Sequence, residues 1–254
     1  MGGLTVLAAL RKRLPHEDFI YLGDTARLPY GTKSPQTVYR YAEQASQHLL
    51  DAGVKALVIA CNTASGVALA ALKRHYAPLP VFGVVEPGAQ AAAQKASHAG
   101  VLVLATESTV AAGAYQRALL KERADLIVYA RSCPLWVTLA EMGPQPQNLV
   151  SAALQHGIRG FQNKPGLTVL LGCTHFPVLR SVLQNELPEA DVRIVDSAST
   201  TATAVARALD AEGLSKPNGL GEITFLATDD VDRFRRIGAY FLGAPLAAVR
   251  AVNL

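Results

Sequence analysis

Short apolar runs recur along the chain, and nearly every one is followed by a segment whose apolar positions keep helical spacing. The runs lie at 19–22, 54–60, 81–85, 101–105, 126–130, 167–172, 192–195, 222–227 and 246–252. Runs of this length that contain many branched apolar residues are typical of buried strands in parallel sheets. The regular alternation of strand and helix therefore predicts an α/β fold built from βαβ units with mostly parallel sheets.

Helices are predicted between these strands, and Pro and Gly residues mark several of their ends. They lie at 4–13, 35–49, 62–76, 89–97, 110–123, near Glu141, and at 148–160, 177–187, 198–208 and 230–241. The simplest division into domains places residues 1–88 and about 200–254 in one α/β domain. Residues from about 89 to 199 then form the second domain.

Two of the strand-to-helix junctions share one plan. The segments 54–65 and 167–177 are each an apolar run that ends in a cysteine, Cys61 or Cys173, and then turns into small polar residues that open a helix. Open α/β sheets bind ligands at the carboxyl ends of their strands. A helix N-terminus at that edge favours a thiolate over a thiol. Both cysteines are therefore candidates for chemistry.

Two thiols on opposite sides of a small substrate suit one kind of reaction. One thiol takes a proton from a carbon atom, and the other returns a proton to the opposite face, so that the stereocentre inverts without a metal or cofactor. The competing interpretation is that both cysteines are buried structural residues, since free cysteine is among the most buried residue types. The equivalent positions of Cys61 and Cys173 favour the catalytic interpretation, and we interpret Cys133 as structural.

Composition excludes several other classes of protein. Hydrophobic residues make up 50% and charged residues 17% of the 254 residues, which is typical of a globular chain. The net charge of +4 is modest and its basic residues are scattered, so we expect no nucleic-acid partner. No apolar run is long enough to span a membrane, and three cysteines do not indicate a disulfide framework. These features predict a protein of the reducing cytoplasm.

No metal or cofactor site is predicted. The chain lacks a Cys-x-x-Cys pair, and Cys173-x-His175 is not a usual zinc spacing. Neither Gly2-Gly3 nor the segment 219–221 fits a dinucleotide or phosphate-binding fingerprint.

An ordered set of motifs resembles the glutamate racemase family of the aspartate/glutamate racemase superfamily. The motifs are Gly23-Asp-Thr-Ala-Arg-Leu-Pro-Tyr-Gly31, Ala60-Cys-Asn-Thr-Ala-Ser65, Gly83-Val-Val-Glu-Pro-Gly88, Ala105-Thr-Glu-Ser-Thr-Val110, Gly172-Cys-Thr-His-Phe-Pro177 and Val195-Asp-Ser-Ala198. Each motif alone is weak, but the set in this order is specific and spans essentially the whole chain.

The resemblance implies a cofactor-independent racemase that makes D-glutamate for peptidoglycan, commonly as a homodimer. It implies two Rossmann-like or flavodoxin-like domains, related by a pseudo-twofold axis, with the active site in the cleft between them. Cys61 would deprotonate D-glutamate and Cys173 would deprotonate L-glutamate.

The resemblance also assigns substrate contacts, several of which have structural alternatives. Those assigned to the substrate are Tyr30, Gly31, Asn62, Thr63, Thr106, Thr109, Thr174 and His175. The segment around Tyr30 could instead be an ordinary turn, and the two threonines of 106–109 could be simple helix caps. For Asp24, at the end of its strand, a structural role explains the residue at least as well as a catalytic role does.

Two further residues are assigned to the catalytic set. His175 resembles the family's histidine beside the second thiol, where it could tune that thiol or help it donate a proton. Its alternative is a packed or solvent-facing histidine. Glu141 resembles a carboxylate near Cys173, although a single glutamate of this kind is more often a surface charge.

The chain departs from the family at its beginning. Family members carry a first strand and an Asp-Ser-Gly turn before the segment that is here residues 2–6, whereas Met1 stands in that place. We expect that the loss of a central strand would expose apolar neighbours and leave ladder groups unpaired. Two hypotheses follow, a natural protein that begins earlier or a racemase with impaired activity, and we favour the first.

Two other functions remain open from sequence. One is a related aspartate or hydantoin racemase, against which the Pro-Tyr-Gly loop and the Cys-Thr-His segment argue. The other is a binding protein that keeps the fold without catalysis, for which the absent Asp-Ser pair argues.

Overall fold

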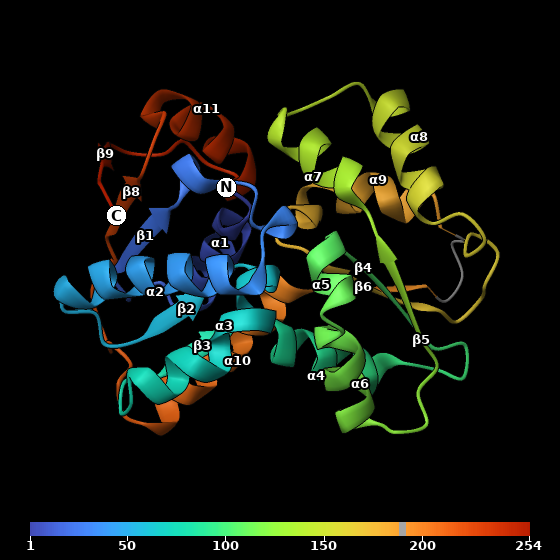
Figure 1. Ribbon diagram of the computed structural model, residues 1–254, viewed down its shortest axis with the longest axis horizontal. Coiled ribbons are helices and arrows are strands. Elements are labelled where there is room, and N and C mark those ends of the chain that lie inside the picture. The colour runs from blue at the N-terminus through green and yellow to red at the C-terminus, as the bar shows by residue number, and fades with distance from the viewer. Residues whose placement is uncertain (188–191) are drawn as a thin grey trace.

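The computed structural model describes residues 1–187 and 192–254, and its strands form parallel sheets (Figure 1). The strands are β1 (Phe19–Gly23), β2 (Leu57–Ile59), β3 (Val81–Gly83), β4 (Val101–Ala105), β5 (Val128–Ser132), β6 (Thr168–Gly172), β7 (Arg193–Asp196), β8 (Ile223–Ala227) and β9 (Val249–Ala251). The predicted α/β class with parallel pairing is confirmed.

Helices connect these strands along the described chain. They are α1 (Gly3–Arg13), α2 (Pro35–Asp51), α3 (Asn62–His75), α4 (Val85–Lys95), α5 (Glu107–Ala111), α6 (Ala114–Glu122), α7 (Pro134–Glu141), α8 (Gln147–Gly157), α9 (Arg180–Asn185), α10 (Ser197–Ala211) and α11 (Val231–Leu242), with 3-10 turns η1 (Thr25–Arg27), η2 (Tyr30–Thr32) and η3 (Phe176–Leu179). None of the described helices is long and apolar enough to cross a membrane.

The sheet in the order β5-β4-β6-β7 forms the core of one half of the molecule. All residues of β4 and β6 are buried, as expected for central parallel strands. Alternate residues of β4 face opposite sides: Leu102 and Leu104 pack with Trp136, whereas Val103 packs with Tyr115. Helices therefore cover both faces, and only the ends of the strands are free to build a site.

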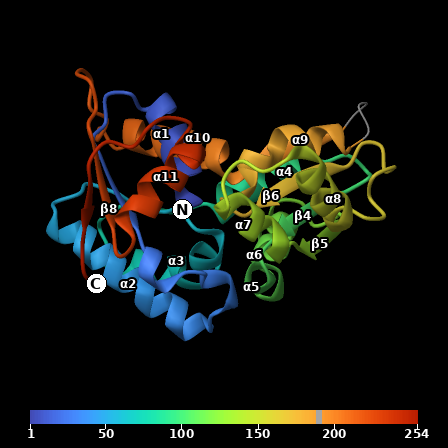
Figure 2. The ribbon, with the colours of Figure 1, turned by 90° about the horizontal axis from the view of Figure 1, so that it is seen from above.

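The other half contains two smaller sheets, β1-β8-β9 and β2-β3. The two halves lie side by side when the molecule is viewed from above (Figure 2). Within residues 1–187 and 192–254, β1 pairs only with β8 and β2 only with β3, so no ladder joins β1 to β2. Residues 20–22 and 58–59 are only half-buried, and they line the cleft between the halves.

Helix α10 contacts both halves, since it packs on α1 and also touches α4 and β6. The proposed domain boundary near residue 200 therefore falls inside a helix and not in a linker. The division into 1–88 with about 200–254, and about 89–199, stays a prediction.

Several element boundaries differ from those predicted, and two of the differences have a clear local cause. The strand expected at 81–85 ends at Gly83, and residues 86–88 lie within the first turn of α4. A proline is tolerated there because the first helical amides have no partner inside the helix. The single helix predicted at 110–123 is two helices, separated at Gly113, whose φ of 62° is left-handed and suits glycine.

Candidate active site

Both cysteines predicted for catalysis line one cleft of about 890 Å³ between the halves. Cys61 lies just beyond β2, and Cys173 follows β6 directly. The carboxyl ends of parallel strands from two different sheets therefore meet at this cleft, as open α/β sheets favour. Residues from α5, α7 and α11 complete its walls.

Cys61 is the N-cap residue of α3, with extended backbone angles and a half-buried side chain. Burial raises the pKa of its thiol, and hydrogen bonds from the backbone amides of Ala64 and Thr63 act in the opposite direction. The helix-end amides thus favour the thiolate, as predicted, but desolvation is the larger effect. The helix end therefore lowers the pKa of the Cys61 thiol by less than burial raises it.

Cys173 is only 4% exposed. Burial raises the pKa of its thiol to about 12, against the lowering effect of the backbone amide of His175. Two neutral thiols are accordingly the resting state of the unliganded cleft at neutral pH. At Cys173, as at Cys61, burial outweighs the neighbouring backbone amide.

A histidine and a carboxylate stand behind Cys173. The Sγ atom of Cys173 lies 3.6 Å from Nδ1 of His175, and Nε2 of that histidine lies 3.0 Å from Oε1 of Glu141. Burial lowers the pKa of His175, although its hydrogen bond to Glu141 opposes the shift. Arg233 of α11 is 3.9 Å from Glu141. The structure thus brings Glu141, at the end of α7, to the cleft and not to the outer surface.

Three threonine hydroxyls meet where the two halves touch. Oγ1 of Thr63, on α3, lies 3.1 Å from that of Thr106 and 3.2 Å from that of Thr109, while the latter two are 2.9 Å apart. Thr106 also caps α5 through the amide of Thr109. The alternative of a helix cap is therefore confirmed for Thr106, and the contacts with a substrate stay a prediction. Thr63 and Thr106 line the cleft, and Thr109 supports them from behind.

Asn62 and Thr174 follow the two cysteines, and both are buried at the cleft wall. The carbonyl oxygen of Asn62's side chain accepts a hydrogen bond of 2.6 Å from Tyr115, whereas its amide nitrogen is 3.5 Å from the hydroxyl of Ser197. The backbone carbonyl of Thr174 accepts a hydrogen bond from Thr5. The amide of Asn62 and the hydroxyl of Thr174 thus keep donor capacity for a ligand.

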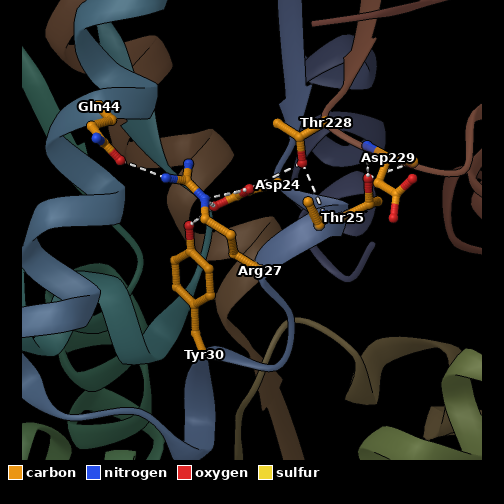
Figure 3. Close-up of polar contacts among 8 residues, drawn as sticks. Asp24, Thr25, Arg27, Tyr30, Gln44, Thr228 and Asp229 are labelled. Atoms are coloured by element: carbon orange, nitrogen blue, oxygen red, sulfur yellow. Dashed lines mark hydrogen bonds and ion pairs between the residues drawn. The ribbon is translucent and has the colours of Figure 1, made fainter. Parts of the chain in front are cut away.

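The loop that carries Tyr30 and Gly31 is tied to the ends of β1 and β8 (Figure 3). Asp24 accepts hydrogen bonds from the phenol of Tyr30, from Nε of Arg27 at 2.7 and 2.9 Å, and from Thr228 at 3.1 Å. The hydroxyl of Tyr30 is therefore already engaged. A Cβ atom on Gly31 would lie 3.1 Å from Cβ of Thr106, so this loop also approaches the other half closely.

Sequence reasoning missed several residues of the cleft and its support. Arg233 and Arg236 on α11 line the cavity and add positive charge. Tyr115 and Ser197 contact Asn62 from behind. The Asp-Ser-Ala motif contained Ser197, but no sequence signal connected the two arginines or Tyr115 to a site.

Cys133 lies apart from the cleft lining, in the apolar cluster around Trp136, and is 3% exposed. Burial raises the pKa of its thiol to about 12. Across residues 1–187 and 192–254, no group of three or more His, Cys, Asp and Glu side chains is arranged to hold a metal ion.

Known proteins match this chain over most of its length. The family described as Asp/Glu/Hydantoin racemase matches residues 5–205. Glutamate racemase of Geobacter metallireducens is 42% identical over 255 residues, covering 100% of this chain and 94% of that protein.

Solved structures give the same result. Glutamate racemase from Thermus thermophilus in complex with beta-chloro-D-alanine has a TM-score of 0.89 and 43% identity, covering 100% of this chain and 93% of that one. Glutamate racemase from Francisella tularensis in complex with D-glutamate has a TM-score of 0.89 and 31% identity, with 99% and 94% covered.

Proposed function

The chain belongs to the Asp/Glu/hydantoin racemase family, and on that basis we propose that it is a glutamate racemase, which interconverts L- and D-glutamate without a cofactor. One observation carries the proposal: Cys61 and Cys173, from different halves, line the same cleft. The curated relative and the solved structures that match nearly the whole chain are glutamate racemases.

The reaction needs one thiolate and one thiol at the same time. The thiolate takes the α-proton of glutamate, the electron pair left on carbon is stabilised next to the α-carboxylate, and the opposite thiol delivers its proton to the other face. We assign Cys61 to the α-proton of D-glutamate and Cys173 to that of L-glutamate. After one turnover the two cysteines have exchanged protonation states.

His175 offers a route to the thiolate of Cys173. Because burial lowers the pKa of His175, its ring is neutral at physiological pH and its Nδ1, 3.6 Å from Sγ, can accept the thiol proton. The carboxylate of Glu141, 3.0 Å from Nε2, then stabilises the imidazolium. His175 and Glu141 thus support proton transfer at Cys173. Beside the thiol of Cys61, the corresponding position is taken by backbone amides of α3.

The α-carboxylate has donors from both halves. Asn62 and Thr63 lie in the first turn of α3, where free backbone amides and the helix dipole attract anions. Thr174 lies beside the second thiol, and Thr106 faces Thr63 across the cleft, with Thr109 behind them. Donors fixed before the reaction stabilise charge as it develops on the substrate.

The side-chain carboxylate of glutamate is assigned to the segment of Tyr30 and Gly31. Because the phenol of Tyr30 donates to Asp24, the backbone amides of this segment are the donors we expect the substrate to use. The approach of Gly31 to Thr106 places these amides at the interface of the two halves.

We further propose that the enzyme supplies D-glutamate for peptidoglycan in the cytoplasm and works as a homodimer, as the family resemblance implies. Light scattering coupled to size-exclusion chromatography measures the mass in solution. A mass equal to one chain at micromolar concentration contradicts the dimer.

The activity is tested by following the circular dichroism of L- or D-glutamate during incubation with the protein. We expect the signal to decay to zero from either enantiomer, and Cys61→Ser or Cys173→Ser to slow this decay by at least about 100-fold, the usual scale of a lost acid or base. Cys133→Ser is the matched control and should keep the activity. Full activity in either of the first two variants contradicts the two-thiol assignment.

Substrate choice is tested by assaying L-glutamate, L-aspartate and a hydantoin side by side under the same conditions. The proposal requires glutamate to be the preferred substrate. Faster turnover of aspartate or hydantoin assigns the chain to another branch of its family. Binding of glutamate without exchange of its α-proton in deuterated water identifies a binding protein.

A further inference from the structure

Tyr115 is a buried polar residue that contacts both cysteine-bearing turns without lining the cleft. It lies on α6, in the half that carries Cys173, and is 0% exposed. Burial raises its pKa above the ordinary value, so the phenol is a neutral hydrogen-bond donor at neutral pH.

The first contact crosses from one half to the other. The phenol of Tyr115 donates a 2.6 Å hydrogen bond to Oδ1 of Asn62, the residue that follows Cys61. The only other partner of the Asn62 side chain among the described residues is Ser197, whose hydroxyl is 3.5 Å from Nδ2. The bond from Tyr115 is therefore the strong constraint on how this amide is turned.

The second contact is with the strand that leads to Cys173. A Cβ atom on Gly172 would lie 2.8 Å from Cε2 of Tyr115, and one on Gly88 would lie 3.2 Å from its hydroxyl oxygen. The ring thus fits against bare backbone immediately before Cys173, and glycine at 172 is required for that approach. The side chain of Tyr115 is therefore held between Gly172, which precedes Cys173, and Asn62, which follows Cys61.

We propose that Tyr115 is a positioning residue for substrate binding, which fixes the orientation of the Asn62 amide so that its NH2 group faces the substrate. This inference rests on the proposed function and extends it to a residue outside the cleft. An asparagine amide that turns over presents an oxygen in place of a donor, and an oxygen repels a carboxylate. The hydroxyl of Tyr115 donates at 2.6 Å to Oδ1, against 3.5 Å to its alternative acceptor, the backbone carbonyl of Val84, and it therefore favours the orientation that leaves the NH2 group for the substrate.

The test is Tyr115→Phe, which removes the hydroxyl and keeps the ring. We expect KM for both glutamate enantiomers to rise about tenfold, with kcat changed less than threefold, since the thiols keep their places. The matched control is Tyr76→Phe, whose phenol bonds to the backbone carbonyl of Glu43 at 3.2 Å and lies outside the cleft. An unchanged KM in Tyr115→Phe overturns the inference.

A double-mutant cycle separates positioning from a merely structural role. In the Asn62→Ala background there is no amide to orient, so Tyr115→Phe should alter KM less than twofold there. If Tyr115→Phe raises KM equally in both backgrounds, Tyr115 acts through general packing and the inference is wrong.

A second variant keeps the test informative if Tyr115→Phe folds poorly. Gly88→Ala places a methyl group 3.2 Å from the phenol oxygen, on a helix that favours alanine over glycine. We expect a smaller rise of KM, about threefold, which again disappears in the Asn62→Ala background. Gly88→Ala with unaltered KM counts against the inference.

The outcome for wild-type protein distinguishes this inference from the proposed function. If wild-type protein does not racemise glutamate, the proposed function fails. Calorimetric binding of D-glutamate to wild type and Tyr115→Phe still measures the role of Tyr115, with about tenfold weaker binding expected in the variant. If wild type racemises glutamate and the variants do so with the same KM, only the inference fails.

Discussion

At the scale of single residues, burial sets the protonation of the two thiols more strongly than their polar neighbours do. The pKa of both thiols is raised, that of Cys173 to about 12, although backbone amides at each site favour the charged form. A substrate that adds an ammonium group and displaces water changes both contributions. We therefore expect both thiols to be protonated in the free protein at neutral pH, and a thiolate to form only when the cleft is occupied.

A prediction for the free protein follows at Cys61, which is the more exposed of the two thiols. Alkylation by iodoacetamide needs the thiolate, so its rate should be low at pH 7 and should increase until the pH passes the raised pKa, above the ordinary value of 9.0. Mass spectrometry of the Cys133→Ala variant, with glutathione as reference, measures this rate. A rate already at its plateau at pH 7 contradicts the raised pKa.

Glu141→Gln gives a second prediction at this scale, because it removes the charge that supports a protonated His175. We expect kcat/KM to fall about 10- to 100-fold, at or below the usual scale of acid-base catalysis. The fall in kcat/KM must be the same for the conversion of L- to D-glutamate and for the reverse reaction, since the two enantiomers have the same free energy.

The isotope effect locates the loss from Glu141→Gln. If only proton transfer at Cys173 is slowed, the effect with α-deuterated L-glutamate increases relative to that with α-deuterated D-glutamate. Equal isotope effects would falsify the assignment of Glu141 to the Cys173 side. Glu107→Gln, at another carboxylate of the cleft wall, is the control.

At the scale of elements, strands were easier to predict than the contacts between them. The strands at 101–105 and 168–172 were recognisable because their residues are buried on both faces and read as unbroken apolar runs. The start of α4 was missed because Pro87 signals a turn as readily as a first helical turn. The placement of Cys61 and Cys173 at strand ends follows from local pattern alone.

The support of the site could not be predicted in the same way. The bond between Tyr115 and Asn62 depends on how α6 and α3 pack, which no local pattern states. The same holds for Arg233 and Arg236, since an exposed arginine on an amphipathic helix reads as a solvated surface residue.

The loop from Asp24 to Thr32 yields a prediction at the element scale. Asp24→Asn weakens the charge-assisted bond with Arg27 and the bond from Tyr30, so unfolding free energy should fall by about 1.5–3 kcal/mol. KM for glutamate should rise as well, because the loop that Asp24 holds in place includes Gly31, whose backbone amide we assign to the substrate. Urea unfolding and hydrogen exchange of residues 25–32 measure both effects.

Asp18→Asn is the matched control for that variant. Asp18 is paired with Lys216 on the exposed surface, where solvent screens such pairs, and an asparagine oxygen can still accept its other hydrogen bond, from the backbone amide of Glu222. We expect no measurable change in stability or KM. A stability loss in Asp18→Asn equal to that in Asp24→Asn shows that the loop network has no special role.

At the scale of the whole molecule, ligand binding should couple the two halves. Thr63 and Thr106 meet across the cleft, so glutamate held there contacts both halves and stabilises the folded state. At 100 times Kd the gain is about 2.7 kcal/mol, and for a chain of this size each kcal/mol raises Tm by about 2–4 °C. Differential scanning fluorimetry with D-glutamate should therefore show an increase of about 5–10 °C.

D-aspartate provides the comparison for this measurement. Its shorter side chain cannot reach the segment of Tyr30 and Gly31 while its α-carboxylate lies at α3. The increase in Tm at the same concentration should be much smaller, and an equal increase for both ligands contradicts the assigned side-chain site.

One detail of the larger sheet has a consequence for how such proteins can vary. Ala105 at the end of β4 lies directly opposite Gly172 at the end of β6. The next residues, Thr106 and Cys173, therefore leave the sheet at the same level, and both line the cleft. Adding one residue to either strand would turn its following side chain to the opposite face. A single residue inserted into β4 or β6 would therefore turn Thr106 or Cys173 away from the cleft wall.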